Sequence, residues 1–288
     1  MLRDLLDLFA EGAQGALRLR VEGRSQAPGP RPPWLQTAAR LEFVGLGEGS
    51  TTLALECPSI SEGAPEYFAQ RQLFHAFDAD HSAVHLLAES LEEAFAGQSD
   101  SELYDQALLQ RLSSLGRVLD SRLTRLELRS NGKCQTAVDS ERLTKVEGLL
   151  RATPPSQQVT IAGRLDTIRH SDRMFVLLLE DDSSVKGVAE GLAPRQLAEH
   201  FGKIALVEGL AAFRPSGRLL RVEATRVEAA TEADLKLWSR VPRPTFGDLP
   251  EASLILAQGP RSGINAIIGQ WPGEESEEQF LAALAEIS

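Results

Sequence analysis

The densest group of side chains that could do chemistry lies between residues 75 and 85. Three histidines and two aspartates fall within this short stretch. Imidazole and carboxylate groups are common protein ligands of zinc and of other transition metals. One interpretation is therefore a metal-dependent hydrolase with the ligands His75, Asp78, His81 and His85. The interpretation that we favour is a turn followed by a helix that Asp80 or Ser82 caps, with the histidines at its surface.

Other residues with chemical potential are explained more simply. The glycines of residues 45–51 resemble a phosphate-binding loop, but such a loop precedes a helix, and strand-like residues follow here. A β-hairpin turn is the better interpretation. The sequence contains no Gly-x-Ser-x-Gly motif, and neither Cys57 nor Cys134 is adjacent to a histidine. We therefore expect a non-catalytic protein without a cofactor.

The elements with the clearest order lie in residues 157–229. Five strand-like runs are expected there, with a helix at Pro194–Phe201 between the third and the fourth. Three strands, a helix and two strands is the order of an OB-fold, a small five-stranded barrel that binds ligands across one face. The runs are Gln157–His170, Arg173–Glu180, Ser184–Glu190, Lys203–Phe213 and Arg218–Glu228.

Such a barrel offers a second functional hypothesis. Proteins that bind single-stranded nucleic acid combine basic side chains with aromatic rings on which bases stack. In this barrel those residues would be Arg169, Arg173, Phe175 and Arg214. Arg218 and Arg221, near Arg214 in the hairpin between the fourth and fifth strands, extend the same basic rim. The net charge of the chain is −11, without the basic excess that phosphate binding favours. We rank nucleic-acid binding behind protein binding.

The N-terminal part is expected to mix strands and helices. Leu2–Ala10 is predicted as a short helix, and Ala16–Glu22 alternates like a half-buried strand. Two further runs, Thr37–Leu46 and Ser50–Glu56, predict a hairpin. Helices are predicted from about residue 82 to Ala96 and from Ser99 onward, and a strand is predicted at Arg122–Arg129. Thr136–Leu150 is predicted to be a helix, or a short strand followed by a helix. Thr153-Pro154-Pro155-Ser156 reads as a linker, and Thr231–Trp238 as a further helix.

The C-terminal segment carries the features of an interaction tail. Trp271 is an amphipathic anchor of the kind that dominates binding hot spots, and Pro272-Gly273 turns the chain. Acidic residues then stand at the start of a helix, where the helix dipole favours negative charge. Phe280, Leu281 and Leu284 form an apolar stripe suited to a groove on a partner. The alternative is that this helix packs on its own chain.

Residues 268–288 also resemble the Trp-Pro-Gly-acidic tail of small bacterial antitoxins that are paired with PIN-domain toxins. The resemblance implies a toxin-antitoxin system in which this chain restrains a metal-dependent ribonuclease encoded nearby. Glu274 stands where those tails usually have aspartate, and the chain is longer than those antitoxins. The partner-binding residues that it implies are Trp271, Pro272, Gly273, Glu274, Glu275, Phe280, Leu281 and Leu284.

Length and composition are consistent with this organisation. A chain of 288 residues suffices for about two domains. No apolar run approaches the length of a membrane-spanning helix, and two cysteines fit a reducing cytoplasm, so we expect a cytoplasmic protein that binds no membrane. The predicted fold class is α+β: a mixed sheet-and-helix domain at residues 1–152, an OB-like barrel at 157–230, and an extended segment with a helical tail at 231–288.

Overall fold

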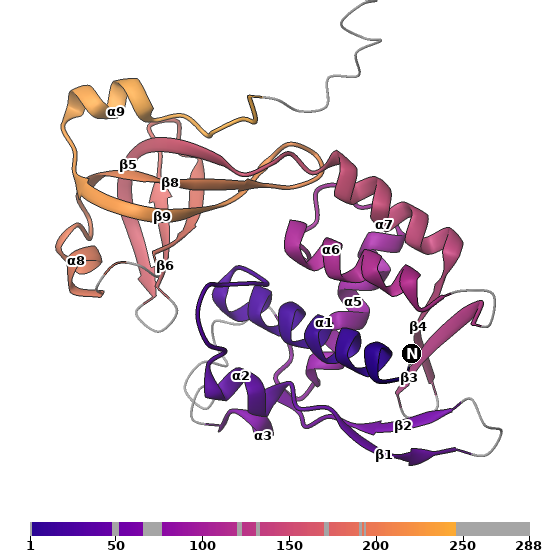
Figure 1. Cartoon of the computed structure of the whole chain (residues 1–288). Coiled ribbons are helices and arrows are strands. Elements are labelled where there is room, and N and C mark those ends of the chain that lie inside the picture. Colours follow the sequence, from indigo (N-terminus) through magenta and orange to yellow (C-terminus); the bar gives the residue numbers. More distant parts are fainter. Residues whose placement is uncertain are drawn as a thin grey trace, which may run out of the picture. The chain divides into compact units, whose positions relative to one another are not determined.

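The computed structural model describes residues 2–47, 52–65, 77–119, 123–130, 133–169, 173–189, 192 and 194–245. Residues Met1–Gly247 form one compact unit, and Asp248–Ser288 form a second. The second unit contains the predicted partner-binding tail, so that prediction lies outside the described residues. Within the first unit the fold is α+β, with helices and two hairpins followed by a closed barrel (Figure 1).

The N-terminal helix is longer than the sequence pattern predicts. Helix α1 spans Leu2–Glu22, so the strand predicted at Ala16–Glu22 is wrong. Leu17, Leu19 and Val21 are all buried, but so is Arg18, which forms an ion pair with Glu22 at 2.6 Å. Because neighbours surround this turn of the helix on most sides, its polar residues are enclosed as well. The alternation of apolar and charged residues in this segment therefore does not indicate a strand with one solvent-exposed face.

Two glycines of α1 allow close helix packing. A Cβ atom at Gly12 would lie 3.1 Å from Cδ1 of Leu87, and one at Gly15 would lie 3.3 Å from Cδ1 of Leu108. Larger residues at these positions would push the neighbouring helices away. The glycines therefore bring α1 against α5 (Ala83–Phe95) and α6 (Gln106–Ser113).

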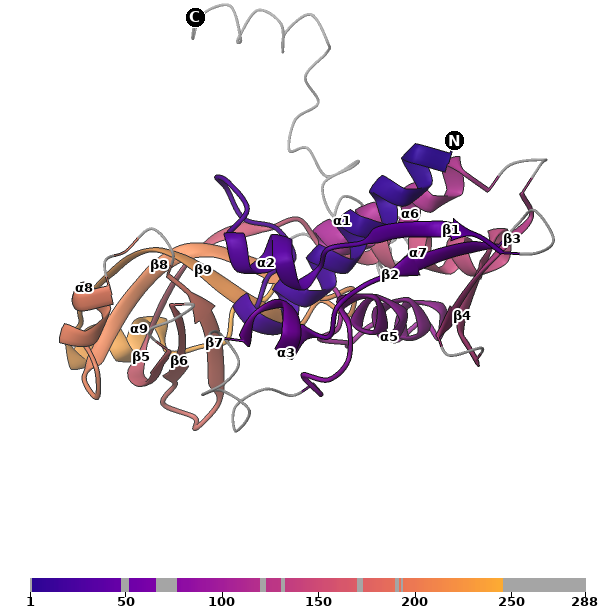
Figure 2. The same cartoon turned by 90° about the horizontal axis from the view of Figure 1, so that it is seen from below.

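Around α1 lie short helices and two antiparallel hairpins (Figure 2). The predicted hairpin near residue 50 is confirmed as β1 with β2, although β1 begins only at Glu42, after a short helix. The predicted strand at Arg122–Arg129 corresponds to β3, which pairs with β4. The elements are α2 (Pro33–Ala38), β1 (Glu42–Leu46), β2 (Leu53–Glu56), α3 (Ile60–Gly63), η1 (Ser114–Arg117), β3 (Arg125–Ser130), β4 (Lys133–Asp139) and α7 (Ser140–Ala152).

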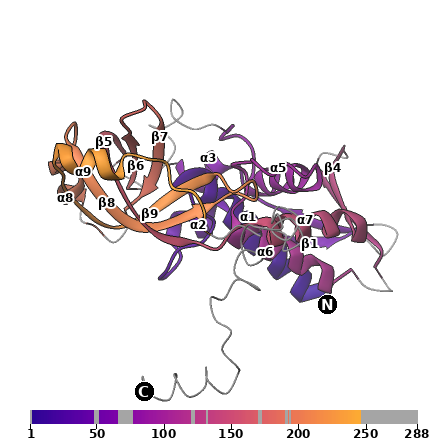
Figure 3. The ribbon, with the colours of Figure 1, turned by 90° about the horizontal axis from the view of Figure 1, so that it is seen from above.

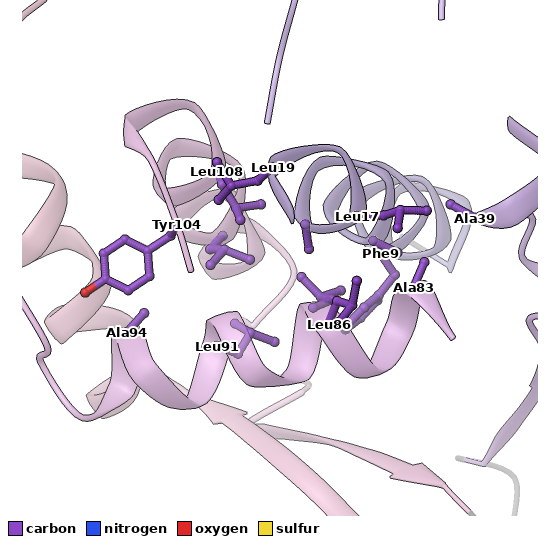
Figure 4. Close-up of a cluster of buried hydrophobic side chains, with 14 of the residues drawn as sticks. Phe9, Leu17, Leu19, Ala39, Ala83, Leu86, Leu91, Ala94, Tyr104 and Leu108 are labelled. Carbon is purple, nitrogen blue, oxygen red and sulfur yellow. The ribbon is translucent and has the colours of Figure 1, made fainter. Parts of the chain in front are cut away.

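The buried apolar side chains that the structure describes form two separate clusters. The first comes from the helices and the hairpins, and its members lie between Leu5 and Leu149 in the sequence. Leu17, Leu86 and Tyr104 belong to it (Figure 4). The second lies inside the barrel, between Ile161 and Ala224 in the sequence. The linker predicted at residues 153–156 separates the two clusters along the chain.

The barrel follows the predicted order of strands and helix. Its strands are hydrogen-bonded in the order β5-β6-β7-β9-β8, and β8 returns to β5 to close it. The pairs are antiparallel except β7 with β9, which is parallel. This topology is compatible with an OB-like fold. The elements are β5 (Gln157–Arg169), β6 (Met174–Leu178), β7 (Ser184–Val188), α8 (Pro194–Glu199), β8 (Ile204–Phe213) and β9 (Leu219–Ala229).

Helix α9 (Glu232–Trp238) follows the barrel and contacts β5 and β8 (Figure 3). Thr231 caps it, as the sequence predicts, in a reciprocal capping box with Asp234. No helix among the described residues is long and apolar enough to cross a membrane.

Candidate functional site

The most elaborate polar arrangement lies where the barrel meets the helices. Four cations contribute to it, which we call the basic face: Lys186, Arg214, Arg218 and Arg221. Lys186 is on β7, and the arginines flank or follow the turn between β8 and β9. That turn is tight because Gly217 adopts a φ of 79°, and because the Arg214 amide donates to the Arg218 carbonyl at 2.8 Å.

The basic face meets the acidic turn, residues Ser99–Asp105, which precedes α6. The turn is held by its own hydrogen bonds. The amide of Ser101 donates to the Gln98 carbonyl at 3.2 Å, and the Tyr104 hydroxyl donates to the same carbonyl. At its end Asp105 caps α6 by accepting the Leu108 amide at 3.0 Å. The helix predicted from Ser99 therefore begins only at Gln106, and the preceding polar residues form a turn instead.

The outer contacts of the site are partly exposed ion pairs. Arg218 contacts Asp100 at 2.6 Å, and Lys186 contacts Glu102 at 2.8 Å. Arg214 binds the main chain and a side chain of the turn. It donates to the Asp100 carbonyl at 2.8 Å and to the Glu102 carboxylate at 2.7 Å. The hairpin also contacts the main chain of the turn, because the Ser216 amide donates to the Ser99 carbonyl at 3.0 Å.

The inner contact is a buried ion pair. Arg221 donates from Nη2 to Asp105 at 3.1 Å, and the two residues are only 7% and 4% exposed. The Asp105 carboxylate also accepts the amide of Ser25 at 3.0 Å and the Ser25 hydroxyl. Buried charges need such saturation because desolvation is costly. Asp105 therefore ties the loop after α1, the start of α6 and the barrel strand β9 together.

The charges of the site lower the pKa values of its acids. Burial alone would raise the pKa of Asp105, but the Arg221 charge and the bonds from Ser25 and Leu108 outweigh burial and hold it below the usual range. Glu102 behaves in the same way, with Lys186 and Arg214 overcoming its burial. The hydrogen bond from Ser216, ahead of the charges of Arg218 and Arg214, lowers the pKa of Asp100. The acids of the turn therefore remain ionised well below neutral pH.

Two donors of the basic face are buried without a hydrogen-bond partner among the described residues: Nε of Arg214 and Nη1 of Arg221. Buried donors are normally satisfied, so such exceptions call for an explanation. A cavity of about 400 Å³ lies beside Arg221, and Gln26, Phe213 and Glu223 also line it. The site therefore contains donor capacity and space that the acidic turn does not use.

The structure places the predicted nucleic-acid residues in different environments. Phe175 is 1% exposed in the barrel core, where its ring fits over Gly187, so it cannot stack on a base in this structure. Arg214 is engaged by the acidic turn. Arg169 lies at the end of β5 and contacts the Met174 sulfur, and Arg173 has a left-handed backbone with a φ of 56°. These four residues do not form one exposed platform.

The residues of the predicted metal site are arranged as neighbours on a helix start. The rings of His81 and His85 stack with centroids 4.9 Å apart, and Nδ1 of His85 lies 3.1 Å from the Ser82 hydroxyl. Asp78 accepts the amide of Asp80 at 3.0 Å. Burial, followed by the His81 charge, lowers the pKa of His85. His75 lies outside the described residues, within which no group of three histidine, cysteine or acidic side chains could hold a metal.

An exposed apolar surface lies at the end of α9. Its members are Leu237, Trp238 and Val241, which are 69%, 46% and 37% exposed. We call residues 239–245, which follow α9, the strap. The Ser239 hydroxyl accepts the amide of Glu180 at 2.7 Å, and Thr245 donates its amide to the Gln157 side chain at 2.9 Å. These contacts fix both ends of the strap on the barrel and present the apolar surface in a defined conformation.

Sequence reasoning placed Arg214, Arg218 and Arg221 in a basic rim of the barrel, but it missed Lys186 and the acidic partners of these cations. Asp100 and Asp105 bind arginines that lie 118 and 116 positions away, and no local pattern reports such a pair. The concentration of short polar and acidic residues after Gly97 was the available signal, and it was interpreted as a helix start. Comparison with protein-family models, with curated proteins and with solved structures gives no match for this chain.

Proposed function

We propose that this protein is a non-catalytic, protein-binding antitoxin that restrains a partner toxin of the PIN ribonuclease type through its C-terminal tail. The observation that carries the protein-binding part is the apolar surface of Leu237, Trp238 and Val241. An exposed indole flanked by aliphatic side chains is costly in water and is characteristic of surfaces that bind proteins.

The conformation of this surface supports the proposal. Because the strap is fixed at Ser239 and Thr245, docking of a partner there costs little ordering entropy. Arg240 and Arg243 are exposed on the strap, and arginine is enriched with tryptophan at protein interfaces. The cations of the basic face, by contrast, are occupied within the chain, which favours a protein over a nucleic acid as the partner.

The identity of the partner rests on the tail alone. Trp271-Pro272-Gly273 followed by acidic residues resembles antitoxin tails, and the Phe280, Leu281 and Leu284 stripe suits a groove on the toxin. In this proposal the tail blocks the ribonuclease, and the folded unit supplies a second contact through the apolar surface. The chain itself performs no chemistry on the toxin.

Deletion of residues 268–288 tests the proposal. We expect the truncated protein to lose co-purification with the product of the adjacent gene, while its thermal unfolding stays cooperative. Trp238→Ser should weaken the complex by about tenfold or more, since tryptophan hot spots cost about 2 kcal/mol or more on truncation. Phe201→Ser is the matched control, because Phe201 is 57% exposed and lies outside the apolar surface. An unchanged pull-down after the deletion would contradict the antitoxin role.

A further inference from the structure

We infer that the basic face is a binding site for acidic peptide segments, and that the acidic turn is its resident occupant in this structure. This inference goes beyond the proposed function and does not depend on the tail. It makes the barrel a peptide-binding module whose site is filled by residues 99–105 of the same chain.

The contacts are those of peptide recognition rather than of charge alone. The hairpin after β8 binds two main-chain carbonyls: the Ser216 amide donates to Ser99 at 3.0 Å, and Arg214 donates to Asp100 at 2.8 Å. It also binds three carboxylates in succession, those of Asp100, Glu102 and Asp105. Main-chain contacts give affinity and side-chain contacts give specificity in such sites.

A nucleic acid fits these contacts less well. It has no peptide carbonyls for Ser216 and Arg214, and it gains affinity from stacking on exposed aromatic rings. The two aromatic residues of the neighbouring strands, Phe175 and Phe213, are 1% and 2% exposed. An acidic peptide is therefore the ligand class that the described contacts favour.

The outer contacts of the resident turn, those of Asp100 and Glu102, are of a kind that permits exchange, whereas the buried pair of Asp105 with Arg221 anchors the end of the turn. The side chains of Asp100, Glu102, Lys186 and Arg218 are 40%, 50%, 50% and 76% exposed, and ion pairs this exposed are weak and are screened by salt. The described apolar core of the helices and that of the barrel are separate clusters. The contact between acidic turn and basic face is thus mainly polar, as in interfaces that open and close.

The basic face also has capacity that the acidic turn leaves unused. Arg221 is 7% exposed, and its Nη1 has no hydrogen-bond partner among the described residues. The cavity of about 400 Å³ that Arg221 lines has room for a further uncharged group of an external peptide, since Asp105 and Glu223 also line it and disfavour another carboxylate.

The experiment uses full-length protein and a fluorescent peptide with the sequence of residues 97–107. In the variant Asp100→Asn/Glu102→Gln, Asp105 is kept, and the outer contacts of the resident turn are weakened. Because a resident occupant lowers apparent affinity by the fraction of open sites, we expect this variant to bind the peptide about tenfold more tightly than wild type in fluorescence anisotropy. Adding Arg214→Gln and Arg218→Gln to the variant should abolish binding.

Three controls decide the outcome. Glu127→Gln/Glu147→Gln changes the net charge equally, far from the site in sequence, and should bind like wild type. A scrambled peptide of the same composition should bind at least about tenfold more weakly than the authentic one, since it keeps the charge but loses the spacing. If the double variant unfolds, Asp100→Asn alone replaces it, and we expect this single variant to show a smaller gain in peptide affinity over wild type. Equal binding of both peptides, absence of any gain, or tighter binding of a single-stranded oligonucleotide would overturn the inference.

Discussion

At the scale of single residues, Asp105 is the side chain on which most contacts converge. It accepts hydrogen bonds from Ser25, Leu108 and Arg221, which belong to three different parts of the fold. A carboxylate in this position neutralises a guanidinium that is almost fully removed from water. Loss of the carboxylate would leave Arg221 with Glu223, at 2.9 Å and partly exposed, as its remaining acidic partner, and would remove the buried half of its charge compensation, which is the costly way to break such a pair.

We expect Asp105→Ala to lower the free energy of unfolding by about 3–5 kcal/mol, as breaking a buried ion pair does. Urea denaturation measures the change. Asp139→Ala is the matched control, because Asp139 caps α7 by accepting the Arg142 amide at 2.9 Å. Loss of an ordinary cap should cost only about 1 kcal/mol. Equal losses in the two variants would show that the contact with Arg221 adds nothing.

The sequence could identify Asp105 as a polar residue near a helix start, but not as the residue that joins the two halves of the chain. That role depends on Arg221, which the sequence marks as part of a basic rim of the barrel without indicating its acidic partner. Phe175 shows the opposite difficulty. An aromatic ring in a barrel strand could belong either to a stacking surface or to the core. The ring of Phe175 belongs to the core because it packs over Gly187, which has no side chain.

At the scale of elements, two glycines show how position decides the effect of the same change. Gly187 lies in β7, and a Cβ atom there would be 2.1 Å from Cζ of Phe175. Gly148 lies on the exposed side of α7, where nothing comes within 4 Å of such an atom. The first glycine is required by packing, and the second only adds flexibility to a helix.

We therefore expect opposite results from two alanine substitutions. Gly187→Ala should reduce the free energy of unfolding by about 1–3 kcal/mol or more, because it forces the Phe175 ring from its place. Gly148→Ala should increase it by about 0.5–1 kcal/mol, since alanine favours the helical conformation. Thermal denaturation followed by circular dichroism measures both. A neutral Gly187→Ala would contradict the described packing of the ring.

Prediction of elements succeeded where one face is buried and the ends are marked. Apolar and polar residues alternate in the barrel strands, and turn residues bound them. Thr231 and Asp234 form the capping box that marks the start of α9. It failed in α1, whose second half is buried almost all round, so that Arg18 and Arg20 interrupt the apolar stripe. The spacing of Arg18 and Glu22, four residues apart, was the local sign of a helix.

At the scale of the whole molecule, acid should weaken the contact between acidic turn and basic face. The folded-state pKa values of Asp100, Glu102 and Asp105 are lowered from 3.8, 4.5 and 3.8. An acid with a lowered pKa contributes stability above its unfolded value, and this stability is lost as the pH falls through the folded value. The unfolded chain then binds more protons than the folded one.

We expect the free energy of unfolding to fall as the pH drops below about 4.5, near the unfolded pKa values of these acids. Asp100→Asn/Glu102→Gln should show a shallower fall. Denaturation at pH 7 and at successively lower pH values measures both slopes. High salt should reduce the difference between the two proteins, because it screens the exposed pairs. Parallel slopes at low salt would mean that the acidic turn contributes nothing to the pH dependence.

The sequence predicted the α+β class and the barrel. It did not predict the contact between the acidic turn and the basic face of the barrel. The ion pairs that make this contact join residues that are 84–118 positions apart in the sequence. Each partner is one polar residue among many in its own segment. Their partners become neighbours only after both halves have folded. Local periodicity contains no information about such a relation.

The separation of the two apolar cores along the chain has a consequence for biosynthesis. All described members of the first core are synthesised before β5, so the helices can begin to collapse while the barrel is still incomplete. The barrel must wait for β9, which bonds to both β7 and β8. During that interval the carboxylates of residues 100, 102 and 105 on the nascent chain do not yet have the complete basic face to contact.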